Sequence, residues 1–177
     1  MSNPYAVDRD AAKKVIKSST NTPSVTKLLL ISFPASRRGR GPWWTDRDYR
    51  NYTSERNSYP SIQQAKLEAD EYLVAMANAR ASRGGPPFQA ISLRPTWMLN
   101  SKGTGKVHLG KTAALGRVTR EDVAAVAVSL LSRDDTQGWF DLVEGNVGIE
   151  EAVDTVVRSG INSIEGEDLD RIYKLSD

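Results

Sequence analysis

A short basic and aromatic segment is the first place where residue types and spacing could do chemistry. It interleaves three arginines with two tryptophans: Arg37, Arg38, Arg40, Trp43 and Trp44. Guanidinium groups bind phosphates and indole rings stack on bases, so the segment could bind nucleic acid or another anionic ligand. Three arginines in one segment fall short of a basic face, however, and the formal net charge is only +2. We therefore do not expect a nucleic-acid partner.

Metal and thiol chemistry find little support in the composition. The sequence contains no cysteine, which excludes disulfides, thiolate metal sites and cysteine nucleophiles. The single histidine, His108, cannot form a multi-histidine site and is expected to be an ordinary polar residue on a short strand. No apolar run approaches the roughly 18 residues of a membrane span. We expect a cytoplasmic protein with no metal site and no membrane partner.

The elements that must position any site alternate between helices and strands. Helical spacing of apolar residues predicts helices at 8–18, 61–82, from about 120, at 148–160 and at 165–175. Apolar runs predict strands at 25–33, 88–95, 106–110 and 138–145. Thr119 and Asp122 have capping-box spacing at the start of the third helix. This alternation predicts one α/β domain over residues 1–177, with helices on the faces of its sheet.

Four stretches of the sequence together resemble one family. They are the strand that ends at Ser32, the helix segment AKLEADEYL (65–73), the strand end SLRP (92–95) and the helix start TREDVA (119–124). In this order the chain is similar to the atypical short-chain dehydrogenases/reductases, which are NAD(P)-binding Rossmann proteins with NmrA-like relatives. The similarity runs from about Asp8 to Val157, most of the chain.

The resemblance implies a partial Rossmann-like fold, a doubly wound parallel sheet of which only the later strands and helices are present. In the family the earlier half opens with a strand and a G-x-x-G-x-x-G turn, whose glycines let the backbone approach the cofactor pyrophosphate. No such motif precedes Val25. NADP or NAD is therefore the implied cofactor, but the glycine-rich motif is absent. We expect the truncated, C-terminal and substrate-side half of the fold.

Catalysis in the family uses a tyrosine that exchanges a proton with the substrate, a lysine four residues later, and a serine that orients the carbonyl. Lys66 matches the lysine and Ser32 matches the serine. Ile62 stands four residues before Lys66 and has no proton to give. Tyr59 precedes Lys66 by seven residues, about 10.5 Å along a helix against about 6 Å for the family spacing. The candidate catalytic residues are Ser32, Lys66 and Tyr59, without an intact proton relay.

The resemblance also implies contacts to the cofactor from one helix residue and one strand end: Lys66, Arg94, Pro95 and Thr96. The alternative for Arg94 is an ion pair with Glu68 or Asp70 on the neighbouring helix. Residues 34–60 show no clear periodicity and are expected to form a long loop, which the resemblance places beside the substrate cleft.

The strand at Val25–Phe33 has a consequence that does not depend on chemistry. In the usual strand order of this fold, its neighbour on one side belongs to the half that is not present. An apolar edge strand is a template for pairing. We therefore expect the chain to form a homodimer through this strand, to cover the edge with its N-terminal segment, or to be marginally stable.

Three functions fit these features. The leading one is an oxidoreductase-like protein of the NAD(P)-binding family, with an unknown small-molecule substrate and no competence for hydride transfer alone. The second is a cofactor-independent enzyme, a cyclase or isomerase, that uses the polar groups of the same cleft. The third is an NmrA-like regulatory protein that binds other proteins. Tight cofactor binding, cofactor-free turnover and a stable protein complex would distinguish them.

Overall fold

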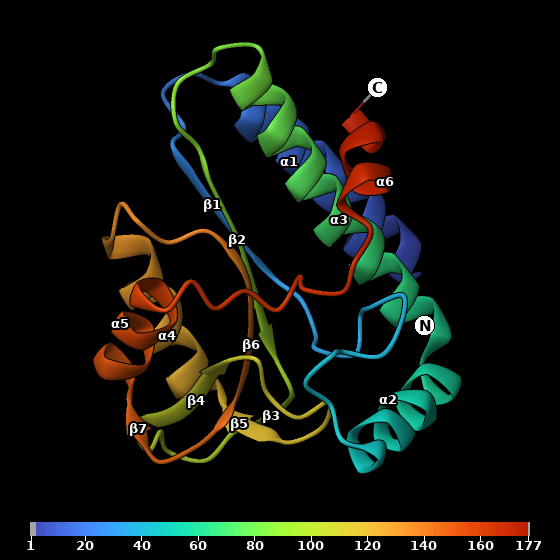
Figure 1. Cartoon of the computed structure of the whole chain (residues 1–177), viewed down its shortest axis with the longest axis vertical. Coiled ribbons are helices and arrows are strands. Elements are labelled where there is room, and N and C mark those ends of the chain that lie inside the picture. The colour runs from blue at the N-terminus through green and yellow to red at the C-terminus, as the bar shows by residue number, and fades with distance from the viewer. Residues whose placement is uncertain (1–2, 177) are drawn as a thin grey trace.

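A computed structural model describes residues 3–176 of the chain, in which helices and strands alternate (Figure 1). The helices are η1 (Tyr5–Ala11), α1 (Ala12–Asn21), α2 (Asp46–Ser58), α3 (Pro60–Ser82), α4 (Arg120–Ser132), α5 (Ile149–Arg158), α6 (Leu169–Tyr173) and η2 (Lys174–Ser176). The strands are β1 (Lys27–Ile31), β2 (Gln89–Pro95), β3 (Trp97–Leu99), β4 (Lys106–Gly110), β5 (Arg117–Thr119), β6 (Gly138–Glu144) and β7 (Val147–Gly148). The predicted α/β class is confirmed.

The main sheet has the strand order β1-β2-β6-β4-β7 and is mixed. β1, β2 and β6 are parallel, as expected, whereas β4 runs antiparallel to both β6 and β7. The expectation of a wholly parallel sheet was therefore wrong for this edge. In β4, exposed Lys106 and His108 alternate with buried Val107 and Leu109. Such alternation is typical of an antiparallel strand with one covered face.

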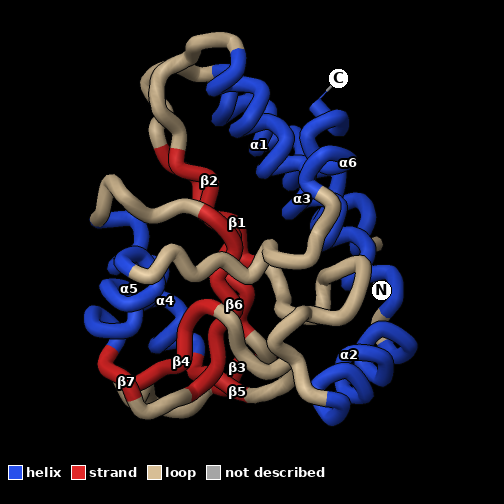
Figure 2. The backbone as a smooth tube through the Cα atoms, in the orientation of Figure 1, coloured by secondary structure: helices blue, strands red, loops and turns tan. Residues whose placement is uncertain are grey.

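Helices cover the two faces of the sheet (Figure 1). Each face has its own apolar cluster. On one face, Leu28 and Leu30 of β1 pack with Leu73 of α3 and Ile16 of α1. On the other face, strands β2, β4 and β6 pack against α4 and α5, with Leu130 among the fully buried residues. Figure 2 shows the loop after α5 crossing to α6, so the chain links the two helical layers near its end.

The segment 34–60 is not one long loop, because α2 occupies most of its second half. Thr45 and Asp48 form a capping box, in which each side chain accepts from the other residue's backbone N–H. The helix buries little except Tyr52, whose ring lies 5.4 Å from that of Trp44. A helix that is solvated nearly all round carries no strong apolar period, which explains why the pattern did not predict it.

The longest helix, α3, has 23 residues and agrees with the helix predicted at 61–82. It begins with Pro60, and proline is favoured there because the first N–H of a helix has no partner within it. Gly84, at φ +70°, follows its end. Within the described part of the chain, neither this helix nor any other is long and apolar enough to cross a membrane.

β1 is the end strand of the main sheet and pairs only with β2 among the described strands. The backbone N–H of Ser32 donates to the Leu93 carbonyl of β2. Because successive residues of a strand point in opposite directions, the backbone groups of Leu29 and Ile31 face the open edge. The edge that the sequence predicted to be unpaired is present.

Candidate functional site

A buried arginine lies at the ends of the parallel strands. Arg94 of β2 is fully enclosed, and its guanidinium forms ion pairs with Asp70 of α3 and Asp141 of β6. The hydroxyl groups of Ser32 and Ser92 both donate to the Asp70 carboxylate. The alternative prediction for Arg94, an ion pair with Asp70, is confirmed. Ser32 is therefore fixed by this carboxylate as well as by its position at the end of β1.

The two carboxylates of this cluster are poor acids for a structural reason. Burial raises the pKa of Asp141 to about 6, although the positive charges of Arg94 and Arg37 act in the opposite direction. Burial also raises the pKa of Asp70 against the same Arg94 charge. The Cζ atom of Arg94 lies 4.2 Å from the ring centroid of Trp139. The cluster thus ties β2, β6 and α3 together with little access from solvent.

Lys66 lies at the open edge of the sheet. Its Nζ atom is 3.0 Å from Oδ1 of Asp8 and donates to the carbonyl of Ile31 at 3.4 Å. A cavity of about 120 Å³ lies here between the N-terminal helix and α3, and Ser32 and Lys66 both line it. The structure therefore brings two of the three candidate catalytic residues together, with Asp8 as a neighbour that the sequence did not predict.

Tyr59, the third candidate, lies outside this cavity. It is the residue just before α3, its side chain is 43% exposed, and its ring packs 5.5 Å from the ring of Trp97. Ile62 is 40% exposed and stands one helical turn before Lys66. The structure therefore does not place Tyr59 in the cavity of Lys66, and the broken relay stays a prediction.

The three strand-end residues expected to contact the cofactor, Arg94, Pro95 and Thr96, are all buried. Thr96 donates its backbone N–H to the carbonyl of Leu142, and Arg94 is engaged by its two carboxylates. Trp97, the next residue, is the first exposed one. The role of Arg94, Pro95 and Thr96 in cofactor binding stays a prediction.

The basic and aromatic segment binds groups of the chain itself. Its arginines pair as follows: Arg37 donates to the carbonyls of Ser163 and Glu165, Arg38 to Glu71, and Arg40 to Asp46. The indole N–H groups of Trp43 and Trp44 both donate to the carbonyl of Thr112. These side chains tie the segment to α3, to the loop after β4 and to the C-terminal part of the chain.

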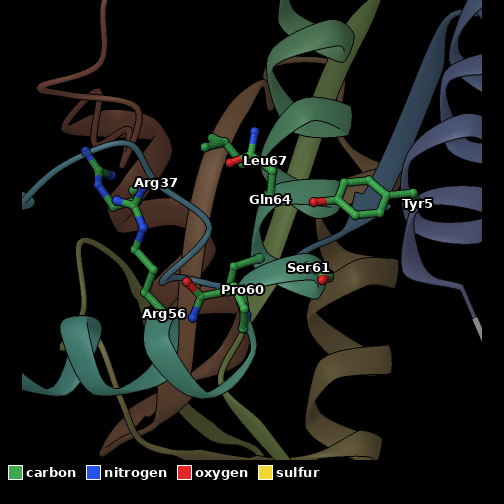
Figure 3. A pocket seen from close by; sticks show the side chains of 8 residues that line it. Tyr5, Arg37, Arg56, Pro60, Ser61, Gln64 and Leu67 are labelled. Atoms are coloured by element: carbon green, nitrogen blue, oxygen red, sulfur yellow. The ribbon is translucent and has the colours of Figure 1, made fainter. Parts of the chain in front are cut away.

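A larger pocket of about 250 Å³ opens between η1, α2 and the first turn of α3 (Figure 3). Arg37 and Arg56 lie on one side of it, and Tyr5 and Ser61 lie on the other. Gln63 also lines the pocket, although it is only 5% exposed. Sequence reasoning singled out neither Arg56 nor Gln63, because no motif contains them and the helix that carries Arg56 had been expected to be loop.

Comparison with known proteins identifies the family. The profile of a family described as NAD(P)H-binding matches residues 2–134. The chain belongs to this NAD(P)H-binding family. The match begins at residue 2, so it does not support the expectation that the similarity is confined to a C-terminal half.

Several proteins resemble this member of the NAD(P)H-binding family. A UPF0659 protein of Schizosaccharomyces pombe is 29% identical over 162 residues, which cover 89% of this chain and 62% of the relative. The oxidoreductase ylbE of Lactococcus lactis has a TM-score of 0.69 at 18% identity, covering 88% of this chain and 63% of that one. A Veillonella parvula short-chain dehydrogenase/reductase in complex with NADP has a TM-score of 0.55 at 14% identity, covering 79% and 60%. The chain thus spans less than two thirds of each relative.

Two glycine-containing turns of this chain lie next to acidic side chains. The N–H groups of Gly103 and Gly105 donate to the carboxylates of Glu121 and Asp122. A second glycine turn, 145–148, leads from β6 into α5, but the first turn of α5 carries two glutamates, Glu150 and Glu151, which repel phosphate. These two turns therefore place carboxylates, which repel phosphate, beside the glycine N–H groups.

Proposed function

We propose that this chain is an oxidoreductase-like protein of the NAD(P)H-binding family that carries the substrate side of a nucleotide site and does not transfer hydride alone. One observation carries the proposal. Ser32 and Lys66 line one cavity at the end of β1, while Ile62 occupies the position one turn before Lys66. An ammonium and a hydroxyl can orient a ribose and a reacting oxygen, but isoleucine cannot pass a proton.

The neighbours of Ser32 and Lys66 define what each group can do. Bound NAD(P)H would supply the hydride. Lys66 would bind the ribose hydroxyls. To do so, its ammonium group must release its ion pair with Asp8. The Ser32 hydroxyl donates its hydrogen bond to Asp70, so its oxygen is left to accept a hydrogen bond from a ligand. In this state Ser32 fits a substrate hydroxyl better than a carbonyl.

Calorimetric titration of the 177-residue chain with NADPH and with NADH tests the proposal. We expect weak, millimolar binding, because a lysine and a serine replace a full dinucleotide site. Lys66→Ala should weaken it further, and Asp8→Asn should strengthen it by releasing the ammonium from its ion pair. Lys14→Ala is the matched control, since it removes the same charge from an exposed position on α1.

Two outcomes would overturn the proposal. Lys66→Ala could bind the cofactor as tightly as the unmodified chain, which would mean that Lys66 contributes nothing to a nucleotide site. Alternatively, the purified chain could oxidise NADPH with a carbonyl acceptor and no other protein, followed by loss of NADPH absorbance. That result would mean that a proton donor other than the family tyrosine is at work.

A further inference from the structure

The pocket between η1, α2 and α3 contains a buried amide with nothing to bond. Gln63 is 5% exposed, and neither its Oε1 nor its Nε2 atom has a hydrogen-bond partner within residues 3–176. Leaving a buried donor and acceptor unpaired is unfavourable. A side chain that offers both one acceptor and two N–H donors to a pocket is suited to a polar ligand.

The same pocket lies at the N-terminus of α3. Tyr59, the residue before the helix, provides no side-chain cap, and the first turn contains no acidic residue. The N–H group of Ser61, which lines the pocket, belongs to the first turn, where a helix supplies no partner. By contrast, α2, α4 and α5 all carry acidic residues in their first turns. The positive end of the dipole of this long helix is therefore open to an anion.

Positive charge on the wall of the pocket agrees with an anionic ligand. Arg56 is exposed, and its Nη1 atom donates to the Tyr52 hydroxyl at 2.9 Å. Arg37 is paired with Glu167 at 3.4 Å, so its charge is balanced within the chain. Its Nε atom, however, is buried and has no partner among the described residues. Among residues 3–176 Arg56 has no ion pair, so it supplies the uncompensated charge, and Arg37 supplies one further donor.

We propose that this pocket binds a small hydroxycarboxylate. The carboxylate accepts from the Arg56 guanidinium and from the N–H group of Ser61 at the start of α3, and the hydroxyl of the ligand donates to Gln63 Oε1. The pocket volume of about 250 Å³ lies below the roughly 300–1,000 Å³ of drug-sized sites, so the ligand is small. The inference stands whether or not the chain binds a nucleotide, because none of these groups lines the cavity of Lys66.

A nuclear magnetic resonance titration of the full chain tests this site with four probes: lactate, propionate, lactamide and inorganic phosphate. Lactate should shift the backbone amides of Ser61 and Ile62 and the side-chain amide of Gln63. Propionate lacks the hydroxyl and lactamide lacks the charge, so each should bind more weakly than lactate. Phosphate tests whether the site merely attracts anions, and it too should bind more weakly.

Three variants separate the contributions. Arg56→Gln should weaken lactate binding about tenfold, because it removes a charged hydrogen bond. Arg50→Gln, an equal change on an exposed position of the same helix, should leave it unchanged. Gln63→Met should abolish the preference for lactate over propionate. The same substitution should raise the midpoint of thermal unfolding, because it removes an unpaired buried amide.

The opposite results would overturn the proposal. Equal binding of lactate and lactamide would mean that the carboxylate does not contribute to binding. Equal binding of lactate and propionate would mean that Gln63 does not recognise the hydroxyl. Phosphate binding as tight as that of lactate would leave a general anion site only. Absence of any shift at Ser61, Ile62 and Gln63 with lactate would mean that the pocket takes no such ligand.

Discussion

The Nε atom of Arg94 lies 3.0 Å from Oδ1 of Asp141, and both side chains are completely removed from solvent. The same guanidinium also serves Asp70. Buried charges are stabilised by one another and not by water. Removal of one partner therefore leaves the other with an uncompensated desolvation cost. This relationship makes the strand ends sensitive to single substitutions.

Arg94→Met should lower the free energy of unfolding by about 3–5 kcal/mol, because it leaves two buried carboxylates without their cation. Urea denaturation followed by circular dichroism measures the change. The matched control is Arg133→Met, which also removes an arginine paired with two aspartates but does so at the surface. Its effect should be much smaller, and equal effects of the two substitutions would contradict the argument.

Asp141 should give the stability a distinctive pH dependence. Burial raises its pKa to about 6 in the folded chain, above the ordinary value of 3.8, so between these values the folded state binds more protons than the unfolded state. The contribution of this group is therefore fully present below about pH 4 and is lost as the pH rises through 6, with a slope of at most about 1.4 kcal/mol per pH unit.

The measurement is the difference in unfolding free energy between the unmodified chain and Asp141→Asn across this range. As the pH rises, the unfolding free energy of the unmodified chain should fall relative to that of Asp141→Asn, since the asparagine does not titrate. Asp70, whose pKa burial also raises, acts in the same direction and is present in both proteins. A difference that is constant, or that moves the other way, would mean that Asp141 is ionised throughout.

The sequence predicted elements well where one strong local signal existed. The helix at 61–82 and the strand at 88–95 both lie within a residue of α3 and β2, because helix formers end there in a glycine and proline cluster. The Thr119 cap of α4 was likewise expected from spacing. The Asp122 carboxylate, however, also binds the loop at Gly105, a contact that no local pattern encodes.

The candidate site was less predictable, because it too depends on contacts between residues that are far apart in the sequence. Ser32 and Lys66 were found through a family resemblance, and they do share a cavity. The partner of Lys66, Asp8, and the pocket of Tyr5, Arg56 and Gln63 arise where distant segments meet. The hydrophobic period and the turn residues report on neighbours along the chain, and they carry little information about contacts between distant segments.

The open edge of β1 leads to a prediction about assembly. We propose that a second copy of the chain pairs with this strand, because backbone groups facing an open edge are a template for another strand. Light scattering should then give the mass of a dimer for the unmodified chain. Ile31→Lys places a charge at the end of this edge, where the side chain is 38% exposed, and should yield a monomer.

Val147→Lys is the control for the dimer, since Val147 is 40% exposed on β7, at the opposite end of the sheet from β1. It should leave the mass unchanged. A monomeric unmodified chain would mean that the N-terminal helix, whose Val7 and Asp8 lie beside Ile31, covers the edge sufficiently. Equal loss of the dimer in both variants would mean that the dimer does not form specifically through β1.

The break in the proton relay can be tested by restoring it. Ile62→Tyr places a phenol one turn, about 6 Å, before Lys66 on an exposed part of α3, where a ring can be accommodated. A neighbouring ammonium favours the charged form of a phenol, so the pKa of the introduced group should be lowered by about one unit. Ultraviolet titration of the difference between the variant and the unmodified chain measures it.

The same titration in Ile62→Tyr combined with Lys66→Ala should return the phenol to its ordinary pKa, and combined with Asp8→Asn it should lower the pKa further. Asp8 competes for the ammonium at 3.0 Å, so the order of the three proteins reports how far Lys66 is available to a neighbour. An introduced phenol with the same pKa in all three would mean that Lys66 does not face this turn of α3. The relay would then be broken by geometry as well as by residue type, and an oxidoreductase role would need its proton from another group.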